Sequence, residues 1–395
     1  MLRRLATTSA CAAVVCGSLA CPSFLGAQAL GGEVTAKAVS SAIDSLGAFE
    51  FTERMAAART VRRASPAIAV PALTRAVSSH KDQYVRFRAL VVLSGFNDPG
   101  TRDVMLKALA DPNDRVRAVA YAWFGYDVDP TVLPRLLQAL DREESELVRP
   151  ALTRALAAYG KDPKVRQALS DLIMKGYDLF RAAVIEAAGD YNADYALKPV
   201  IEVSKLDGPL QDDAVLAIGK IGDKRGLETL AALQRTSPRT LQPTIAAAIC
   251  LLGSNCASHQ AYISKTLEFA IENPGFQDLL RAAAGALAAL AVAGNADAAS
   301  VLIDRGIPTR DPERAAIALA LGTVALRNTP LLLSVLEKRS DTAGSIELLR
   351  EAFDMFEEDF EEERFFALVR RTYWKAPEGS ATRRVAESLI QGLEF

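Results

Sequence analysis

Residues 111–124, DPNDRVRAVAYAWF, decide the fold, because variants of this stretch recur along the chain at a nearly constant interval. Each copy holds a two-residue word whose second member is arginine or glutamine, at 53–54, 85–86, 116–117, 148–149, 180–181, 210–211, 241–242, 280–281 and 313–314. Successive words are 32, 31, 32, 32, 30, 31, 39 and 33 residues apart. A period of this length is typical of a solenoid, in which each repeat is one small unit stacked on its neighbours.

Apolar residues inside each unit follow a helical spacing. The residues four and eight positions after the first member of the word are all apolar: Ala57, Ala89, Ala120, Leu152, Val184, Ala214, Ile245, Ala284 and Ile317, then Val61, Leu93, Phe124, Leu156, Ala188, Ile218, Ile249, Ala288 and Leu321. This spacing places them on one stripe of a core-facing helix. A second apolar pattern precedes the word, as in AVPALTRAV at 69–77. Asp-Pro pairs such as Asp111-Pro112 and Asp162-Pro163 mark breaks between helices.

Composition supports an all-α chain. Half of the 395 residues are hydrophobic but only 7% are aromatic, and β-branched runs are few. The formal charge of −2 provides no basic field for a nucleic acid, so no nucleic-acid partner is expected.

The pattern resembles the HEAT repeat, particularly the short HEAT-like units in which a turn acid is followed by Val-Arg and small residues. The clearest copies are residues 111–124, 144–156 and 177–189, whereas the units around Leu210 and Leu241 lack the arginine. The resemblance covers nearly all of the chain from about Val34 and implies an α-solenoid (α-α superhelix) of about ten stacked helix-pair repeats. Residues 346–356 are read as the tenth unit, and an insertion near 263–280 lengthens the unit that contains Arg281.

The recurring arginine has a structural explanation. In HEAT solenoids such residues form a ladder of hydrogen bonds between neighbouring turns, and the resemblance implies the same for Arg54, Arg86, Arg117, Arg149, Arg181, Arg281 and Arg314. An acid three residues earlier, such as Asp114 before Arg117 or Asp178 before Arg181, is placed to pair with the arginine at a helix start. The alternative is a row of anion-binding arginines.

The first 29 residues are predicted to be a secretory signal peptide. MLRR is a positive start, residues 5–20 are apolar, and Ala27-Gln28-Ala29 is a small-x-small cleavage pattern. The alternatives are an uncleaved anchor, although the apolar run is short for a span, or a lipoprotein modified on Cys21. No later stretch predicts a membrane span. The expected organisation is a signal at 1–29, an N-terminal capping repeat at 30–63, the HEAT-like solenoid at 64–344, and a C-terminal repeat with capping helices at 345–395.

Export leaves two cysteines, Cys250 and Cys256, on either side of a Leu-Leu-Gly-Ser-Asn turn. Disulfides persist outside the cytoplasm, so a bridge across this turn is one interpretation. Two small buried thiols are the other.

Catalytic motifs are missing from the sequence. His80 and His259 stand in separate units without a nearby Cys or second His at ligand spacing, and no Gly-rich phosphate loop or nucleophile elbow is present. HEAT-type hydroxylases carry repeated His-Glu pairs for iron, and this sequence has none. The sequence therefore predicts a chain that is not an enzyme and has no cofactor.

The C-terminal segment 355–374 combines an acidic run with Phe365, Phe366, Val369 and Tyr373. We expect a terminal cap that buries the aromatic residues and leaves the glutamates in solvent, with residues 381–395 as the closing helix. An acidic docking patch is the alternative.

The leading hypothesis is an exported, non-catalytic scaffold that binds a protein or peptide in the periplasm or cell envelope. Partner contacts are expected on the groove lined by the second helices, with Phe87, Val91 and Arg154 as the candidates, although Val91 also suits packing between repeats. The alternatives are an envelope enzyme or a cofactor- or pigment-handling protein whose site is assembled across repeats, and a structural component of a larger complex.

Overall fold

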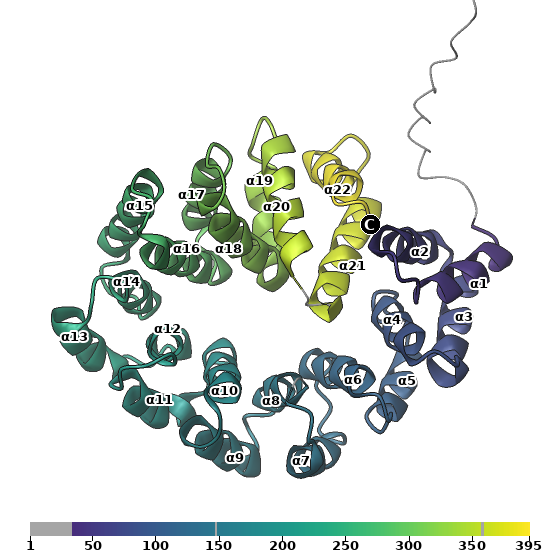
Figure 1. Ribbon diagram of the computed structural model, residues 1–395, viewed down its shortest axis with the longest axis horizontal. Coiled ribbons are helices and arrows are strands. Elements are labelled where there is room, and N and C mark those ends of the chain that lie inside the picture. The colour runs from purple at the N-terminus through teal and green to yellow at the C-terminus, as the bar shows by residue number, and fades with distance from the viewer. Residues whose placement is uncertain (1–33, 147, 357–358) are drawn as a thin grey trace, which may run out of the picture.

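The computed structural model describes residues 34–146, 148–356 and 359–395, and shows helix pairs stacked side by side into a ring (Figure 1). The predicted signal peptide and Cys21 lie outside the described residues. The outer helices are α1 Ala36–Ser45, α3 Pro66–Ser79, α5 Thr101–Ala108, α7 Leu133–Arg142, α9 Pro163–Met174, α11 Leu197–Ser204 after the 3-10 turn η1 Asp194–Ala196, α13 Gly226–Thr236, α15 Cys256–Glu272, α17 Ala296–Gly306 and α19 Thr329–Leu336.

Each outer helix is followed by an inner one. These are α2 Phe51–Arg63, α4 Gln83–Ser94, α6 Asp114–Tyr126, α8 Arg149–Ala157, α10 Asp178–Asp190, α12 Gln211–Ile221, α14 Gln242–Leu251, α16 Gln277–Val292, α18 Glu313–Arg327 and α20 Ala343–Met355. The all-α solenoid of about ten helix pairs is thereby confirmed. The insertion of the eighth unit lengthens α15, which has 17 residues.

Polar side chains cap several helix starts, and Asp162 does so at one of the Asp-Pro pairs noted in the sequence. The side chains of Asp82, Asn113 and Asp162 accept hydrogen bonds from backbone N–H groups in the first turns of α4, α6 and α9. Each such bond satisfies a donor that the helix itself leaves unpaired. The short turns between helices hold each outer helix against its inner partner.

The predicted stripe of apolar residues forms the core. All eighteen stripe residues are buried, with Ala89, Phe124, Leu156 and Ile218 fully so. Because each inner helix contacts the inner helices before and after it, these side chains form a layer between the two rows of helices, made of two core clusters that meet at α14. Burial of this layer is what makes neighbouring units depend on one another.

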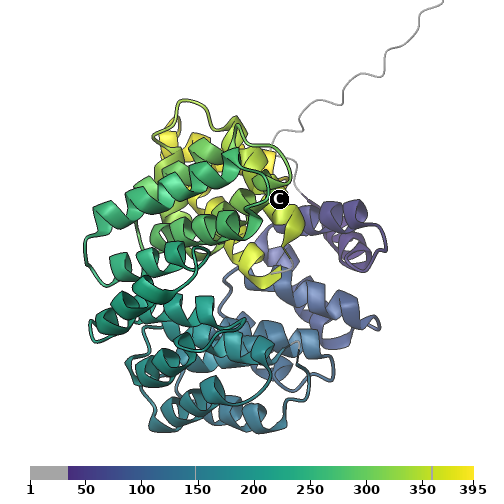
Figure 2. The ribbon, with the colours of Figure 1, turned by 60° about the vertical axis from the view of Figure 1, so that its left-hand side comes forward.

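The last pair, α21 Asp359–Lys375 and α22 Ala381–Gly392, closes the ring. Helix α21 contacts α18 and α19 on one side and α4 and α6 on the other, and both views place it next to the first repeats (Figures 1 and 2). Phe365, Phe366, Val369 and Tyr373 are buried, as expected for a cap. The expectation that the glutamates face solvent is wrong for two of them, because Glu361 and Glu363 are buried against the first repeats.

Among the described residues, no single helix has both the length and the apolar composition of a membrane span, and the pair that meets these criteria together, α18 and α19, is bent by 113°.

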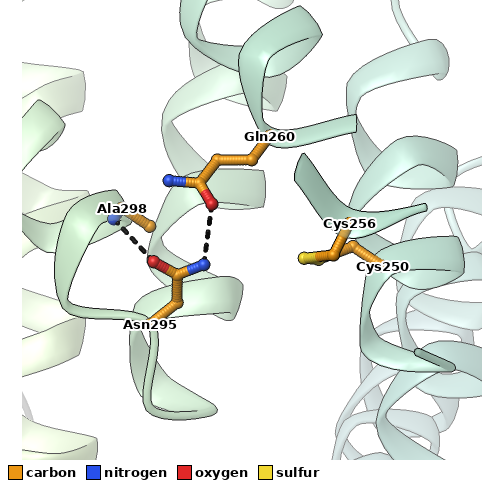
Figure 3. Close-up of a disulfide and its surroundings, with 5 residues drawn as sticks. All are labelled: Cys250, Cys256, Gln260, Asn295 and Ala298. Carbon is orange, nitrogen blue, oxygen red and sulfur yellow. Dashed lines mark hydrogen bonds between the residues drawn. A yellow bond between two sulfur atoms is a disulfide. The ribbon is translucent and has the colours of Figure 1, made fainter. Parts of the chain in front are cut away.

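Cys250 and Cys256 are joined by a disulfide in the structure, with a Cα–Cα distance of 4.2 Å (Figure 3). The bond ties the end of α14 to the start of α15. Nearby, the Asn295 amide donates to Gln260 at 2.8 Å and accepts from the Ala298 N–H, so α15 is also joined to the start of α17.

We expect protein purified from an exporting host to contain no free thiol in the mature chain. Thiol titration of the unreduced, denatured protein checks this, and reduction should release two thiols. Because the closed loop is short, the stabilisation is expected to be at most about 2–3 kcal/mol. Two free thiols before reduction would exclude the bridge.

Candidate functional site

A cavity with a volume of about 1040 Å3 lies inside the ring. Its walls come from the inner helices α2, α4, α6, α8 and α10 on one side, and from α20, α21 and the C-terminal residues on the other. The ring closure therefore forms this cavity, because helices from both ends of the chain line it.

Nine aromatic side chains and seven arginines line the cavity, together with seven carboxylates. The aromatic residues are Phe51, Tyr84, Phe87, Tyr126, Tyr191, Phe353, Phe356, Phe360 and Phe366, and the arginines are Arg54, Arg59, Arg88, Arg115, Arg154, Arg327 and Arg350. Several pair with one another: the Arg54 guanidinium lies 5.7 Å from the Phe51 ring centre, and that of Arg115 lies 5.8 Å from Phe87. Aromatic residues and arginine are the types that contribute most of the energy in protein interfaces.

Two of the three predicted contact residues line the cavity, and the third lies in the core. Phe87 and Arg154 line the cavity, but Phe87 is only 5% exposed because other residues of the ring cover it. Val91 is 1% exposed and packs in the core, so its assignment as a partner contact is wrong. Phe51, at 58% exposure, and Arg115 are accessible cavity residues that the sequence did not single out, as are Tyr126 and Met355.

A charged network covers the inner wall at α8, α10 and α12. Arg154 pairs with Asp190 and with Glu186, and Lys220 donates to Asp190 at 2.8 Å. Burial acts to raise the pKa of Asp190, but Lys220 and Arg154 outweigh it and hold that pKa below its usual value. Asp190 therefore stays ionised and joins three successive inner helices.

Asp213 is the acid of this wall whose pKa is most raised. Burial of its carboxyl, reinforced by the charges of Glu186 and Asp212, raises the pKa of Asp213 to about 6, although the residue as a whole remains exposed. Its charge therefore changes within the range between pH 5 and 7.

Protonation of Asp213 is expected to stabilise the fold at low pH. Because the folded-state pKa lies above the unfolded value, this stability is complete below pH 4 and is lost as pH rises through about 6. For an exposed group we expect a loss below about 1 kcal/mol. Asp213→Asn should remove this dependence between pH 5 and 7 in urea unfolding, whereas Glu228→Gln on outer helix α13 should keep it. An unchanged dependence in Asp213→Asn would contradict the assignment.

The repeated arginines mostly bond to their own turn. Arg54 donates to the carbonyls of Ala48 and Phe49, and Arg181 to that of Ile173. Gln211 and Gln242 donate to backbone carbonyls in the same way. These bonds satisfy carbonyls at the ends of outer helices and in the turns that follow them.

Three of the repeated arginines, which we call the arginine column, also bond to the next repeat. Arg86 lies 3.5 Å from Asp111, Arg117 donates twice to Glu143 at 2.7 and 2.8 Å, and Arg314 donates to Glu351. The expected pairing with the acid three residues earlier occurs for Arg181 and Arg281. Asp114 instead accepts from Ser145. Arg149 differs from the rest, since its guanidinium stacks 4.5 Å from the Phe180 ring centre.

Arg117 and Glu143 line a second cavity, of about 900 Å3, between α5, α6 and α7. The Tyr121 hydroxyl donates to Glu143 at 3.1 Å, and hydrogen bonding from Arg117 lowers the pKa of Glu143. The arginine charge is thus matched by a carboxylate within the fold, which favours a structural role for Arg117 over anion binding.

No group of three or more His, Cys, Asp or Glu side chains with the arrangement of a metal site occurs among the residues that the structure describes. His80 follows α3 and contacts Asp44, and His259 lies on α15. The two histidines therefore do not form a common site.

One of the comparisons with known proteins identifies repeats in this chain. The family model described as HEAT repeats matches residues 41–123 and 102–189. No curated protein sequence matches the chain. Among solved structures, the chain is similar to YibA of Escherichia coli, with 17% identity and a TM-score of 0.41 over 55% of this chain and 82% of that chain. It is similar to a chain in a structure of Kap95p with RanGDP, with 14% identity and a TM-score of 0.36 over 89% of this chain and 53% of that chain. It is also similar to a chain from a structural study of cadherin and β-catenin, with 11% identity and a TM-score of 0.31 over 91% of this chain and 95% of that chain.

Proposed function

Because this chain is a HEAT-repeat protein, we propose that it is a non-catalytic scaffold that binds a protein or peptide inside its ring, and that it does so after export, in the periplasm or cell envelope. The observation that carries the proposal is the central cavity with its aromatic and arginine wall. The stacked inner helices α2, α4, α6, α8 and α10 hold their side of this wall in a fixed shape, so little order has to be imposed on that side when a partner binds.

The accessible side chains of the cavity suit a peptide chain. Phe51 offers a large apolar ring, and Arg115 offers a guanidinium that is exposed and stacks on Phe87. Arginine forms two-pronged hydrogen bonds with carboxylates and backbone carbonyls, and aromatic rings take up apolar side chains. Together these groups provide both the affinity and the orientation that a peptide ligand needs.

Crosslinking and pull-down from an envelope extract with the mature chain test the proposal. We expect the wild-type protein to enrich a partner, Phe51→Ala and Arg115→Glu to lose it, and the outer-surface control Arg135→Glu to retain it. Equal recovery by all four proteins would place binding outside the cavity, and no enrichment at all would contradict the scaffold proposal. A stoichiometric metal or chromophore in the purified protein would favour an enzyme or cofactor carrier instead.

The proposed export of the protein predicts that its N-terminus is removed by signal peptidase. We expect the mature protein to begin at Leu30, because Ala27-Gln28-Ala29 has the small residues that signal peptidase requires. Intact mass spectrometry of protein from the exporting host measures this directly. A species that retains residues 1–29, or that carries lipid on Cys21, would contradict the prediction.

A further inference from the structure

The start of α21 rests on the inner face of the first repeats, far away in the sequence. Glu363 accepts from Arg62 of α2 at 2.7 Å, and Glu361 accepts from the Tyr126 hydroxyl of α6 at 2.9 Å. Asp359 forms an ion pair with Arg88 of α4. Residues 359–363 thus contribute three acids to three different inner helices. We call these five residues the acidic segment.

An aromatic residue anchors the acidic segment. Phe360 is 7% exposed, packs with the hydrophobic core of the first half of the chain, and lies 6.1 Å from the Tyr126 ring centre. The backbone at Gly95, directly after α4, leaves room for the side chain of Glu363, because a Cβ atom at Gly95 would lie 2.9 Å from the Glu363 carboxyl carbon. The surface of α2, α4 and α6 therefore fits the acidic segment in shape as well as in charge.

The charges around Glu363 are incompletely matched, both on α2 beneath the acidic segment and on α21 itself. Glu363 is shared by Arg62 and Arg370, whose side chains are 3% and 17% exposed. Among the described residues, Nη1 of Arg62 and Nη1 of Arg370 are buried without a hydrogen-bond partner. Burial lowers the pKa of Arg370, as expected for a cation with too little opposing charge.

Such a contact is suited to reversible opening. The desolvation of buried ions offsets much of their attraction, so a buried ion pair adds little net stability to the closed ring. The same pairs select for carboxylates at matching positions, because burying an arginine of this surface without a partner is unfavourable in free energy. The surface of α2, α4 and α6 therefore selects a segment with matching carboxylates, but holds the acidic segment weakly enough for another such segment to replace it.

We propose that the inner face of α2, α4 and α6 is a docking surface for an acidic, aromatic-containing helix of a partner protein, and that the acidic segment occupies this surface when no partner is bound. This inference rests on the proposed function and specifies its ligand. The partner helix supplies an aromatic residue in place of Phe360 and carboxylates in place of Asp359 and Glu363. Binding displaces α21 and opens the ring at the contact between its two ends.

A synthetic fluorescent peptide with the sequence of residues 359–368, DFEEERFFAL, is the probe, and the full mature chain is the receptor. In wild-type protein the tethered acidic segment competes at an effective concentration on the order of millimolar, so the peptide binds weakly. Asp359→Asn with Glu363→Gln weakens this competitor, and we expect the peptide to bind that variant at least about tenfold more tightly, or ~1.4 kcal/mol. Arg62→Gln with Arg88→Gln should abolish binding.

Matched controls separate the site from general charge effects. Glu228→Gln with Glu347→Gln removes two exposed carboxylates elsewhere and should bind the peptide as wild type does. A peptide with its acids replaced by amides should bind none of the proteins. Equal peptide affinity in wild type and in the Asp359→Asn, Glu363→Gln variant would overturn the proposal.

Opening of the ring is measured separately, by the distance between spin labels at Ser79→Cys and Glu378→Cys, which lie on opposite sides of the closure and are both exposed. We expect one narrow distance distribution in wild type and a longer, broader one after Asp359→Asn with Glu363→Gln, or after peptide binding. Gly95→Val, which keeps every charge, should also open the ring but should not bind the peptide. If Gly95→Val leaves the ring closed, the proposed fit is wrong.

The two proposals fail in distinguishable ways. If the pull-down recovers a partner through Phe51 and Arg115 but the peptide binds no variant, the scaffold stands and this docking surface is wrong. If the peptide binds as expected but no envelope protein is enriched, the surface stands and the proposed cellular role is wrong.

Discussion

Replacing Arg117 with alanine is expected to destabilise the protein by about 3 kcal/mol, because it leaves a buried carboxylate with too few partners. Glu143 is 3% exposed at its side chain and receives two hydrogen bonds from Arg117. The same guanidinium also donates to the carbonyls of Asp111 and Pro112, so the turn before α6 loses two bonds as well. Urea unfolding followed by circular dichroism measures the loss.

A double substitution tests the reason for the effect. Arg117→Ala with Glu143→Gln should cost less than the sum of the two single changes, since the neutral amide no longer needs a cation. Arg135→Ala, an exposed arginine on α7, should change stability by less than about 0.5 kcal/mol. Additive costs would show that the two side chains act independently. Partner binding should fall only as folding falls, and a selective loss of binding at unchanged stability would show that the arginine column recognises a ligand.

Gly219→Ala is expected to destabilise by about 2 kcal/mol, although alanine is the better helix former. A Cβ atom at position 219 of α12 would lie 2.5 Å from the Ala248 Cα and 2.8 Å from its carbonyl oxygen, on α14 of the next repeat. Backbone atoms cannot rotate aside as a side chain can, so the two inner helices have to separate and the core between them loosens.

Gly285 on α16 provides the matched control for Gly219. A Cβ atom there meets nothing within 4 Å, so Gly285→Ala should stabilise the protein by about 0.5–1 kcal/mol through helix propensity alone. Opposite signs for the two glycines are therefore expected in thermal and urea unfolding. If both variants gain stability, α12 and α14 are not packed as closely as described.

The sequence by itself determined the repeat and its core. The spacing of four and eight residues within each inner helix leaves one arrangement that buries all eighteen stripe residues, and the structure contains that arrangement. Local sequence patterns are sufficient to predict the core, because a solenoid repeat contacts only its neighbours and its packing depends on residues within about thirty positions of one another. The cap at Asp162, which the Asp162-Pro163 pair indicated, is similarly local.

The closure of the ring and the central cavity were decided only by the tertiary structure. Small rotations between successive units add up over ten repeats and determine whether the two ends meet, and no sequence period reports their sum. Glu361 and Glu363 illustrate the consequence: on an isolated helix an acidic run belongs in solvent, but here Tyr126 and Arg62 meet it from helices more than 200 residues away. Val91 was misassigned for the same reason. Its position on the helix was readable from the sequence, whereas what covers that face depends on how neighbouring units pack and where the chain returns.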